Sequence, residues 1–479
     1  MRTTLTLQNL AKGRIHDRWM SAAILSLGVI LRVIVWAANP PNNCLDDHLE
    51  PIAKYAIEGW RPNPKSCWQC YQPPVYYVVS ATVLRATTYL TDHAMPGATS
   101  SRVRRAIGWK AVQAVSALAS VGTMMLTHLI LWLWYPSDRH LCRLALLILA
   151  ILPVDIYAAG FIGNDAMLVC WSTLAVAGYS VLARTARLWT GTALLLGGTI
   201  LAVWTKQSGA VTLLLPCVVL LRLVLHKMRL CRISFLRSKQ MPVLVCVLVT
   251  LPIAMSDEIW RAGKTGMFLF SNQHVFRYAD DQPPRTFDKV SLASFRLVSL
   301  MKEPVMSDAT LASLPTELFA RTWFDYEPRY LPSSRLTKWF ARLLYLLGLP
   351  FVLLTAVGAA QGLKRSLREP AILPLLLLLV GFLAVPFLQT SRFPHFSSMK
   401  AVFVLPAVSI AAMMLVLGLR LLPGRFSQTF ISAAMIIILL IGIGHVALIV
   451  ALRKQHPAEM PVLLGGRKYL VPRWPMPGL

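Results

Sequence analysis

This sequence has few charged residues, and fewer acids than bases. Asp, Glu, Lys and Arg make up only 14% of its 479 residues, whereas soluble domains carry about a quarter. The deficit excludes an ordinary soluble protein and accompanies a hydrophobic content of 56% and a mean hydropathy of +0.57. Apolar runs of about 20 residues recur, the length that crosses a bilayer. Because lipid offers a backbone no hydrogen-bond partners, spanning segments must be helices, and the sequence predicts an all-α multi-pass membrane protein.

Two further absences limit the ligands. The chain has no Gly-rich phosphate loop and no dinucleotide fingerprint, so it lacks the common nucleotide sites. No nucleic-acid-binding motif accompanies its formal net charge of +27. Its Lys and Arg residues lie in short loops between apolar runs, where the positive-inside rule and anionic lipid headgroups account for them. We therefore exclude nucleic acid and expect membrane lipids as partners.

Disulfide and glycosylation signals are also sparse. Among eight cysteines, the C-x-x-C at 67–70 has no second pair, which argues against a zinc ribbon. In an oxidising compartment we expect Cys44 to bond with Cys67 or Cys70 and to pin the first polar loop. No N-x-S/T sequon occurs, which favours the bacterial inner membrane over the endoplasmic reticulum, the alternative location.

One long polar segment, at about 257–337, interrupts the apolar runs. It contains LPTELFARTWFDYEP, which predicts a helix lying on the membrane surface. The side chains expected against the lipid are Leu318, Phe319, Trp323 and Phe324. The candidate spans cover 19–38, 73–91, 106–135, 141–162, 166–184, 191–206, 208–226, 241–256, 338–360, 370–388, 400–421 and 428–452.

Lys and Arg predict the orientation of these spans. The N-terminal tail and the loops at 222–239 and 364–368 are basic and should be cytoplasmic. Asp46, Asp165 and Lys206 then belong on the far side, with the 257–337 segment. Three apolar runs separate Asp46 from Asp165, and an odd number of crossings would put them on opposite faces. We expect the run at 73–91, which opens with two prolines, not to span, leaving about 11 helices that do and an outside C-terminus.

These boundaries predict five parts. Residues 1–18 form a cytoplasmic tail, and 19–256 form a transmembrane module that includes an external loop at 39–72. Residues 257–337 form a larger external loop with interfacial helices. Residues 338–452 supply the C-terminal transmembrane helices, and 453–479 form a second tail.

The external loop after the first span carries two adjacent acids, Asp46 and Asp47, in LDDHLEPIAKYAIEG. Two acids beside a membrane can be a solvated loop. A carboxylate fixed there can also act as a general base on an alcohol or as a metal ligand. The stretch after the acids predicts a short amphipathic helix that stops at Gly59. Several aromatic residues suited to the headgroup layer follow: Trp60, Trp68, Tyr71, Tyr76 and Tyr77.

Four motifs in order resemble the polytopic glycosyltransferases of the GT-C fold, which use a lipid-phosphate sugar as donor and include protein O-mannosyltransferases and lipid A aminoarabinose transferases. The chain reads LDDHLEPIAKYAIEG, QPPVYYVVSA, FIGNDAMLVCWSTLAV and GGTILAVWTKQSGAVTLLLP. The resemblance covers about residues 20–220, with weaker likeness in HFSSMKAVFVLPAVSI. One position departs from the pattern, since Gln72 stands where His is common. The resemblance implies a GT-C-like bundle of about 11–12 transmembrane helices with an external catalytic loop.

The resemblance also implies roles for residues. Asp46 corresponds to the catalytic carboxylate, Asp47 to its partner or a ligand of a divalent metal ion, and Asp165 to the second acid. Other positions correspond to contacts with the donor phosphate or substrate: Lys206, Gln72, Tyr76, Arg392, His395 and Lys400.

Simpler readings of the same residues stay open. Asn164 or Asp165 can cap the helix that starts near Ala166. Lys206 can extend its ammonium from the end of an apolar run to the interface. Arg392, His395 and Lys400 can be ordinary loop residues.

Together these features favour a membrane glycosyltransferase that works by a single inverting displacement on the non-cytoplasmic side. The donor would be a polyprenyl-phosphate sugar, and the acceptor a glycan, a lipid or a protein. The alternative is a transporter or flippase of a lipid-linked sugar, which would place its ionisable groups near the bilayer midplane and show inverted repeats. The third possibility is a non-catalytic scaffold protein in which the acidic loop has only a structural role.

Overall fold

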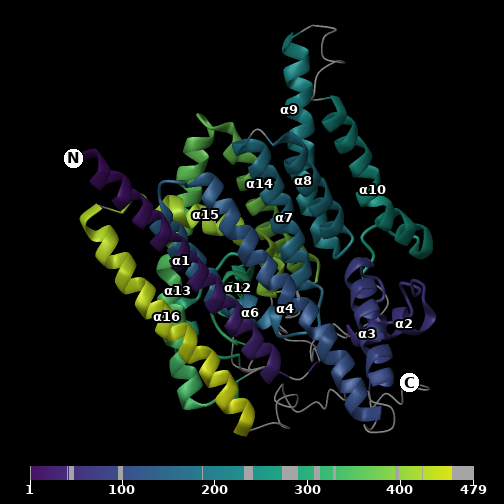
Figure 1. Ribbon diagram of the computed structural model, residues 1–479. Helices are drawn as coiled ribbons and strands as arrows, with labels where there is room; N and C mark the ends of the chain where they lie inside the picture. Colours follow the sequence, from purple (N-terminus) through teal and green to yellow (C-terminus); the bar gives the residue numbers. More distant parts are fainter. Residues whose placement is uncertain are drawn as a thin grey trace.

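Every element in the described part of the computed structural model is a helix (Figure 1). The structure describes residues 2–39, 41, 48–94, 101–185, 187–230, 241–271, 290–306, 313–326, 331–393, 399–422 and 424–455. The α-helices are α1 (Arg2–Ala38), α2 (Leu49–Glu58), α3 (Val75–Ala94), α4 (Ser101–Trp134), α5 (Arg139–Ile151), α6 (Pro153–Ala159), α7 (Asp165–Arg184), α8 (Leu188–Val203), α9 (Leu214–Leu230), α10 (Met241–Thr265), α11 (Leu297–Lys302), α12 (Leu314–Trp323), α13 (Arg335–Ser366), α14 (Leu373–Arg392), α15 (Val408–Leu419) and α16 (Gly424–Gln455). Short 3-10 helices are η1 (Gln207–Leu213), η5 (Val290–Leu292), η6 (Pro370–Ile372), η8 (Ala401–Phe403) and η9 (Leu405–Ala407).

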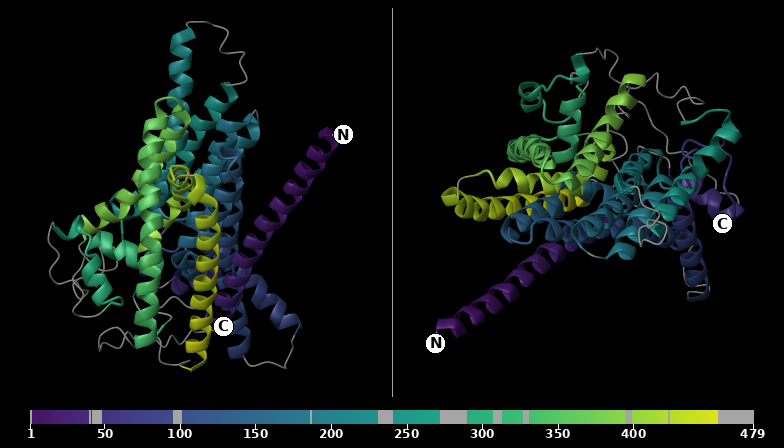
Figure 2. Two further views of the ribbon diagram at one scale, coloured as in Figure 1. Left: turned by 90° about the vertical axis from the view of Figure 1, so that its left-hand side faces the viewer. Right: turned by 90° about the horizontal axis from the view of Figure 1, so that it is seen from above.

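The helices confirm the prediction of an all-α membrane protein, but the described residues hold fewer candidate spans than the about 11–12 predicted. Among the described residues, seven helices are long and apolar enough to cross a membrane, or eight if the bent pair α5–α6 counts as one span. Three shorter apolar helices accompany them, at Leu188–Val203, Gln207–Arg222 and Leu405–Leu419. Helix α3, the run expected not to span, is not among the seven. The first helix starts at Arg2, and Figure 2 shows its N-terminal part projecting away from the bundle.

The bundle is organised around α7, which is buried along most of its length. Glycines let α8 approach it closely. A Cβ on Gly178 would lie 2.1 Å from the backbone nitrogen of Leu195, and one on Gly198 would lie 2.5 Å from that of Ala175. Such close backbone contact between small residues is typical of helix pairs in membranes.

The two ends of the bundle collect different side chains. At one end Arg184 pairs with Glu369 at 2.5 Å, and Arg222 donates to the carbonyl of Pro370. At the other, called the outer end below, α1 and α8 finish and α7 begins. Helices α2 and α3 lie alongside this end, at the lower right of Figure 1. Arg222 and the turn before Pro370, which the sequence analysis assigns to basic cytoplasmic loops, therefore lie at the end opposite Asp165 and Lys206. Which end faces the cytoplasm stays a prediction.

One span is broken. Helices α5 and α6 meet at an angle of 51° because Pro153 has no N–H with which to continue the helix. The guanidinium of Arg32 donates to the freed carbonyls of Ala150 at 2.9 Å and Leu149 at 3.4 Å. It also forms a fully buried ion pair with Asp155. A break inside the bundle is tolerated when its backbone groups find partners in this way.

The stretch expected on the membrane surface lies inside the protein instead. Helix α12 does form, capped by Ser313, but Leu318, Phe319, Trp323 and Phe324 are each less than a tenth exposed. The ring of Trp323 stacks on Phe351 at 6.2 Å between ring centroids, and that of Phe319 lies 5.9 Å from Tyr345. The prediction was wrong because an amphipathic pattern does not tell a lipid surface from the face of another helix, here α13.

Candidate functional site

Asp165 and Lys206 come together at the outer end. Their side chains form an ion pair at 2.5 Å although 41 residues separate them. Asp165 is the first residue of α7, and Lys206 lies in extended backbone between α8 and η1. Both side chains keep some exposure, 15% and 12% respectively. The pair is therefore reachable by a ligand, unlike the fully buried pair of Arg32 and Asp155.

The simpler readings of these two residues fit the geometry poorly. Asn164 occupies the N-cap position of α7, but its side chain makes no capping bond and instead donates to the carbonyl of Thr205 at 3.3 Å. The ammonium of Lys206 lies 4.8 Å from the ring centre of Phe403 and is held by Asp165. An interfacial lysine that only reaches for water would need neither contact.

The QPPVYY segment packs directly against this pair. The N–H of Val75 donates to the carbonyl of Trp204 at 2.9 Å, two residues before Lys206. Tyr76 is fully buried beside Ser116, Ser80 and the carbonyl of Gly163. Burial raises the pKa of Tyr76, so its hydroxyl stays protonated at neutral pH. Tyr76 thus lies near Asp165, and its predicted contact with the donor or substrate stays a prediction.

The side chain of Gln72 forms its hydrogen bonds within its own loop. Its amide nitrogen donates to the hydroxyl of Tyr71 at 2.8 Å and to the side-chain oxygen of Gln69 at 3.2 Å. Its side-chain oxygen is buried with no hydrogen-bond partner among the described residues. The structure therefore gives Gln72 a role in shaping the loop and no contact with Asp165 or Lys206.

The remaining predicted residues divide into two groups. Arg392 is exposed at the end of α14, and Lys400 lies at the start of η8, three residues before the Phe403 that contacts Lys206. The others, Asp46, Asp47, His395 and Cys44, lie outside the described residues. The described chain resumes at His48, which sequence reasoning missed. The buried ring of His48 stacks near Tyr77 and shares a hydrogen bond of 2.8 Å with its hydroxyl, so the point where the acidic pair joins the structure is fixed.

The disulfide differs from the expected one. Cys67 bonds with Cys70, and their Cα atoms lie 5.1 Å apart. Both predicted pairings, Cys44 with Cys67 and Cys44 with Cys70, are therefore wrong. The turn that contains the C-x-x-C brings its own two cysteines within disulfide distance.

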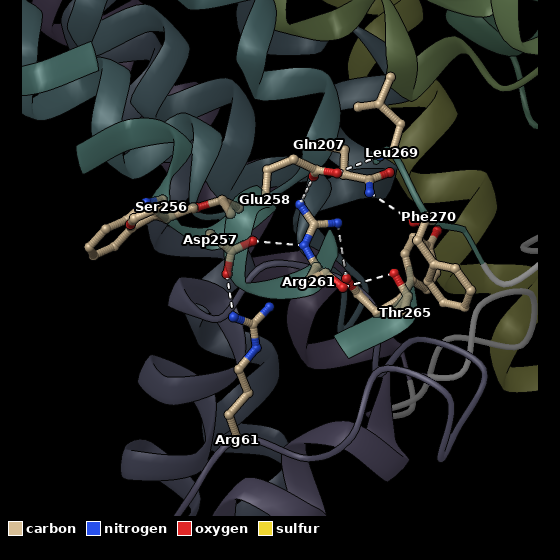
Figure 3. Close-up of polar contacts among 12 residues, drawn as sticks. Arg61, Gln207, Ser256, Asp257, Glu258, Arg261, Thr265, Leu269 and Phe270 are labelled. Carbon is tan, nitrogen blue, oxygen red and sulfur yellow. Dashed lines mark hydrogen bonds and ion pairs between the residues drawn. The ribbon is translucent and has the colours of Figure 1, made fainter. Parts of the chain in front are cut away.

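A buried ionic cluster at the end of α10 was also missed (Figure 3). Arg261 pairs with Asp257 at 2.9 Å and with Glu258, while Arg61 reaches Asp257 from the first loop at 2.5 Å. Burial lowers the pKa of Arg61, and Asp257 partly offsets this effect. The signal was present, because Asp257, Glu258 and Arg261 have the i, i+3 and i+4 spacing of one helical face. The predicted span ends at residue 256, whereas α10 continues to Thr265.

The described residues offer no metal centre. No three of their His, Cys, Asp and Glu side chains converge as ligands. Asp47, the predicted ligand, lies outside them, so the metal ion stays a prediction.

No family model and no curated protein matches the sequence. Similar solved structures include the Archaeoglobus fulgidus oligosaccharyltransferase in its apo form, with 12% identity and a TM-score of 0.46 over 90% of this chain and 56% of that one. ArnT from Cupriavidus metallidurans bound to undecaprenyl phosphate has 14% identity and a TM-score of 0.34, over 86% of this chain and 77% of that one. The chain spans about half the length of the oligosaccharyltransferase. At these values the likeness concerns the general course of the helices.

Proposed function

We propose that this chain is a membrane glycosyltransferase that transfers a sugar from an isoprenoid-phosphate donor at its outer end. One observation carries the proposal. The three described segments that bear the glycosyltransferase-like motifs, at 72–77, 163–166 and 204–207, meet around the ion pair of Asp165 and Lys206. Sequence resemblance alone did not require these segments to touch.

Lys206 is the group suited to the donor phosphate. A lysine ammonium is a compact positive charge with three donors, and it binds phosphate well as a point charge. Asp165 holds that ammonium in place but leaves it partly exposed. As the bond between sugar and phosphate breaks, negative charge grows on the departing phosphate, and a fixed cation stabilises it more than water does.

The reaction we propose is one displacement at the anomeric carbon. A carboxylate, Asp46 in our proposal, takes the proton of an acceptor hydroxyl as the oxygen bonds to that carbon. The bond to the phosphate oxygen breaks and the electron pair leaves with the phosphate, so the anomeric centre is inverted. A divalent ion held by Asp47 would add charge stabilisation beside the phosphate, but no step of this scheme depends on it.

This assignment implies a location and a set of acceptors. A donor carried by an isoprenoid tail reaches the site from within the bilayer, in keeping with the apolar helices around it. We place the outer end in the periplasm of a bacterial inner membrane. The acceptor would be a glycan, a lipid or a protein of the envelope.

Deletion of the gene in its host tests the proposal. We expect one sugar modification to disappear from the envelope glycans seen by mass spectrometry, and wild-type protein to restore it. Lys206→Ala should fail to restore it at equal protein level. The matched control is Lys338→Ala, which removes a lysine from a more exposed ion pair with Glu303 at 3.5 Å and should restore it fully. Full restoration by Lys206→Ala would remove this residue from the reaction.

A further inference from the structure

The end of α10 brings four charges together in a place that the proposed reaction does not use. Asp257, Glu258 and Arg261 are all less than a tenth exposed, and Arg261 is only 2% exposed. Arg261 contacts both acids, and Arg61 adds a second cation to Asp257 while its guanidinium lies 3.7 Å from the ring centre of Trp260. Two positive and two negative groups leave the cluster without net charge to offer an anionic ligand.

The cluster joins α10 to the disulfide loop. Besides its ion pairs, Arg261 donates to the carbonyl of Tyr71 at 3.3 Å, directly after the disulfide cysteine Cys70. Arg61 ties the start of the same loop to Asp257. Figure 3 shows Arg61 reaching the cluster from below while Arg261 lies at its centre. The loop that leads into the QPPVYY segment is thus held at both ends.

The same cluster holds the segment after α10. Glu258 accepts a hydrogen bond from the N–H of Leu269, whose φ of 52° is rare for a bulky residue. Such a backbone costs free energy and persists only when its surroundings hold it. The next residue, Phe270, packs its ring at 6.4 Å from Tyr71, and its carbonyl accepts a hydrogen bond of 2.8 Å from Gln207.

Both segments lead into the candidate site. Tyr71 is followed by the stretch that bonds with Trp204, and Gln207 is the neighbour of Lys206. We propose that Arg261 is a positioning residue: through Asp257, Glu258 and Tyr71 it fixes the disulfide loop and residues 266–270 against Gln207, and thereby the place of Lys206. This role rests on the proposed function of Lys206, but the contacts that define it do not.

Hydrogen exchange on the purified full-length protein tests the positioning role without any assay of transfer. In Arg261→Gln we expect amide exchange in residues 61–72 and 266–271 to rise by about tenfold or more, with the bundle helices unchanged. Arg261→Lys keeps the charge but loses the forked geometry, and should lie between this variant and wild type. The matched control is Arg321→Gln, which breaks a buried i, i+4 pair with Glu317 in α12 and should leave both segments as in wild type.

Arg61→Gln keeps the test valid if Arg261→Gln does not fold. The side chain of Arg61 is 18% exposed, so replacing it disturbs the fold less than replacing Arg261. Amide exchange in residues 61–72 should still rise. Unchanged exchange in Arg61→Gln and Arg261→Lys would overturn the positioning role.

Binding of undecaprenyl phosphate connects the role to the site. We expect Arg261→Lys to bind this probe more weakly than wild type, and Arg321→Gln to bind it as well as wild type. If local exchange is faster in Arg261→Lys but both Arg261→Lys and Lys206→Ala bind the probe as well as wild type, the positioning of the two segments by Arg261 stands and the proposed function is refuted. Loss of binding in Lys206→Ala alone, with unchanged exchange in the Arg261 variants, would refute the positioning role and keep the function.

Discussion

The buried side chain of Arg32 shows how single residues hold this molecule together inside the membrane. Its guanidinium contacts Ser120 at 2.6 Å, Asp155, and carbonyls of α1 and α5. An ionisable group inside a membrane protein is by default a candidate for transport. Two of these contacts satisfy carbonyls beside the bend between α5 and α6, and the ion pair neutralises Asp155. The full set of partners favours a structural role over the transporter alternative.

We expect Arg32→Met to destabilise the protein strongly. It leaves Asp155 buried without its partner, and breaking a buried pair in this way costs about 3–5 kcal/mol. Thermal unfolding in detergent measures the loss. The double variant Arg32→Met, Asp155→Leu should recover part of it, because no lone charge remains. A single variant as stable as wild type would contradict the account of the broken span.

Asp165 and Lys206 show how much of the candidate site can be predicted from the sequence, residue by residue. The apolar runs and the basic loops predicted both on the same side of the membrane, and the structure brings them together at one end of the bundle. Their ion pair was not predicted, because the two residues lie 41 positions apart in the chain and no local pattern connects them. Arg261 and Arg61 were missed because their partners come from separate segments, which no local pattern connects.

At the scale of elements, the α7–α8 contact positions the site. Both helices end or begin beside Asp165 and Lys206, so any separation of the helices moves the pair. Local sequence does not disclose which glycine of α8 faces α7. Gly197 and Gly198 are neighbours, yet a Cβ on Gly198 would lie 2.9 Å from the carbonyl oxygen of Trp171, and one on Gly197 would meet nothing within 4 Å.

The two glycines therefore give a matched experiment. We expect Gly198→Ala to destabilise the protein by about 1–3 kcal/mol, because backbone atoms of α7 must move. Gly197→Ala should be neutral or stabilise it by roughly 0.5–1 kcal/mol through helix propensity. Thermal unfolding of both variants in the same detergent measures the difference. Equal effects would mean that α7 and α8 are not packed as described.

Element boundaries were predicted best where hydropathy alone decides them. Predicted spans such as 166–184 and 370–388 fall within a few residues of α7 and α14. The predictions failed where a polar stretch is buried by protein. Helix α10 runs beyond its apolar part because Arg261 neutralises the acids there, and α12 lies against α13 and not against lipid. Hydropathy records the composition of a segment and not the partner that covers it.

At the scale of the whole molecule, the two ends of the bundle have different chemistry. Arg184, Arg222 and Glu369 meet at one end, and the ion pair, the disulfide loop and the α10 cluster lie at the other. A lipid-linked sugar donor outside the cytosol requires the second end to face away from the cytoplasm. The side of the membrane that the outer end faces therefore decides between the proposed reaction and any reaction in the cytosol.

Thiol labelling in intact cells measures that side most directly. In a chain whose free cysteines are replaced, Lys264→Cys marks the exposed end of α10 and Arg368→Cys marks the exposed opposite end. A maleimide that does not cross membranes should label position 264 from outside, and position 368 only after the membrane is opened. The reverse pattern would place the ion pair of Asp165 and Lys206 in the cytoplasm and contradict the proposed function.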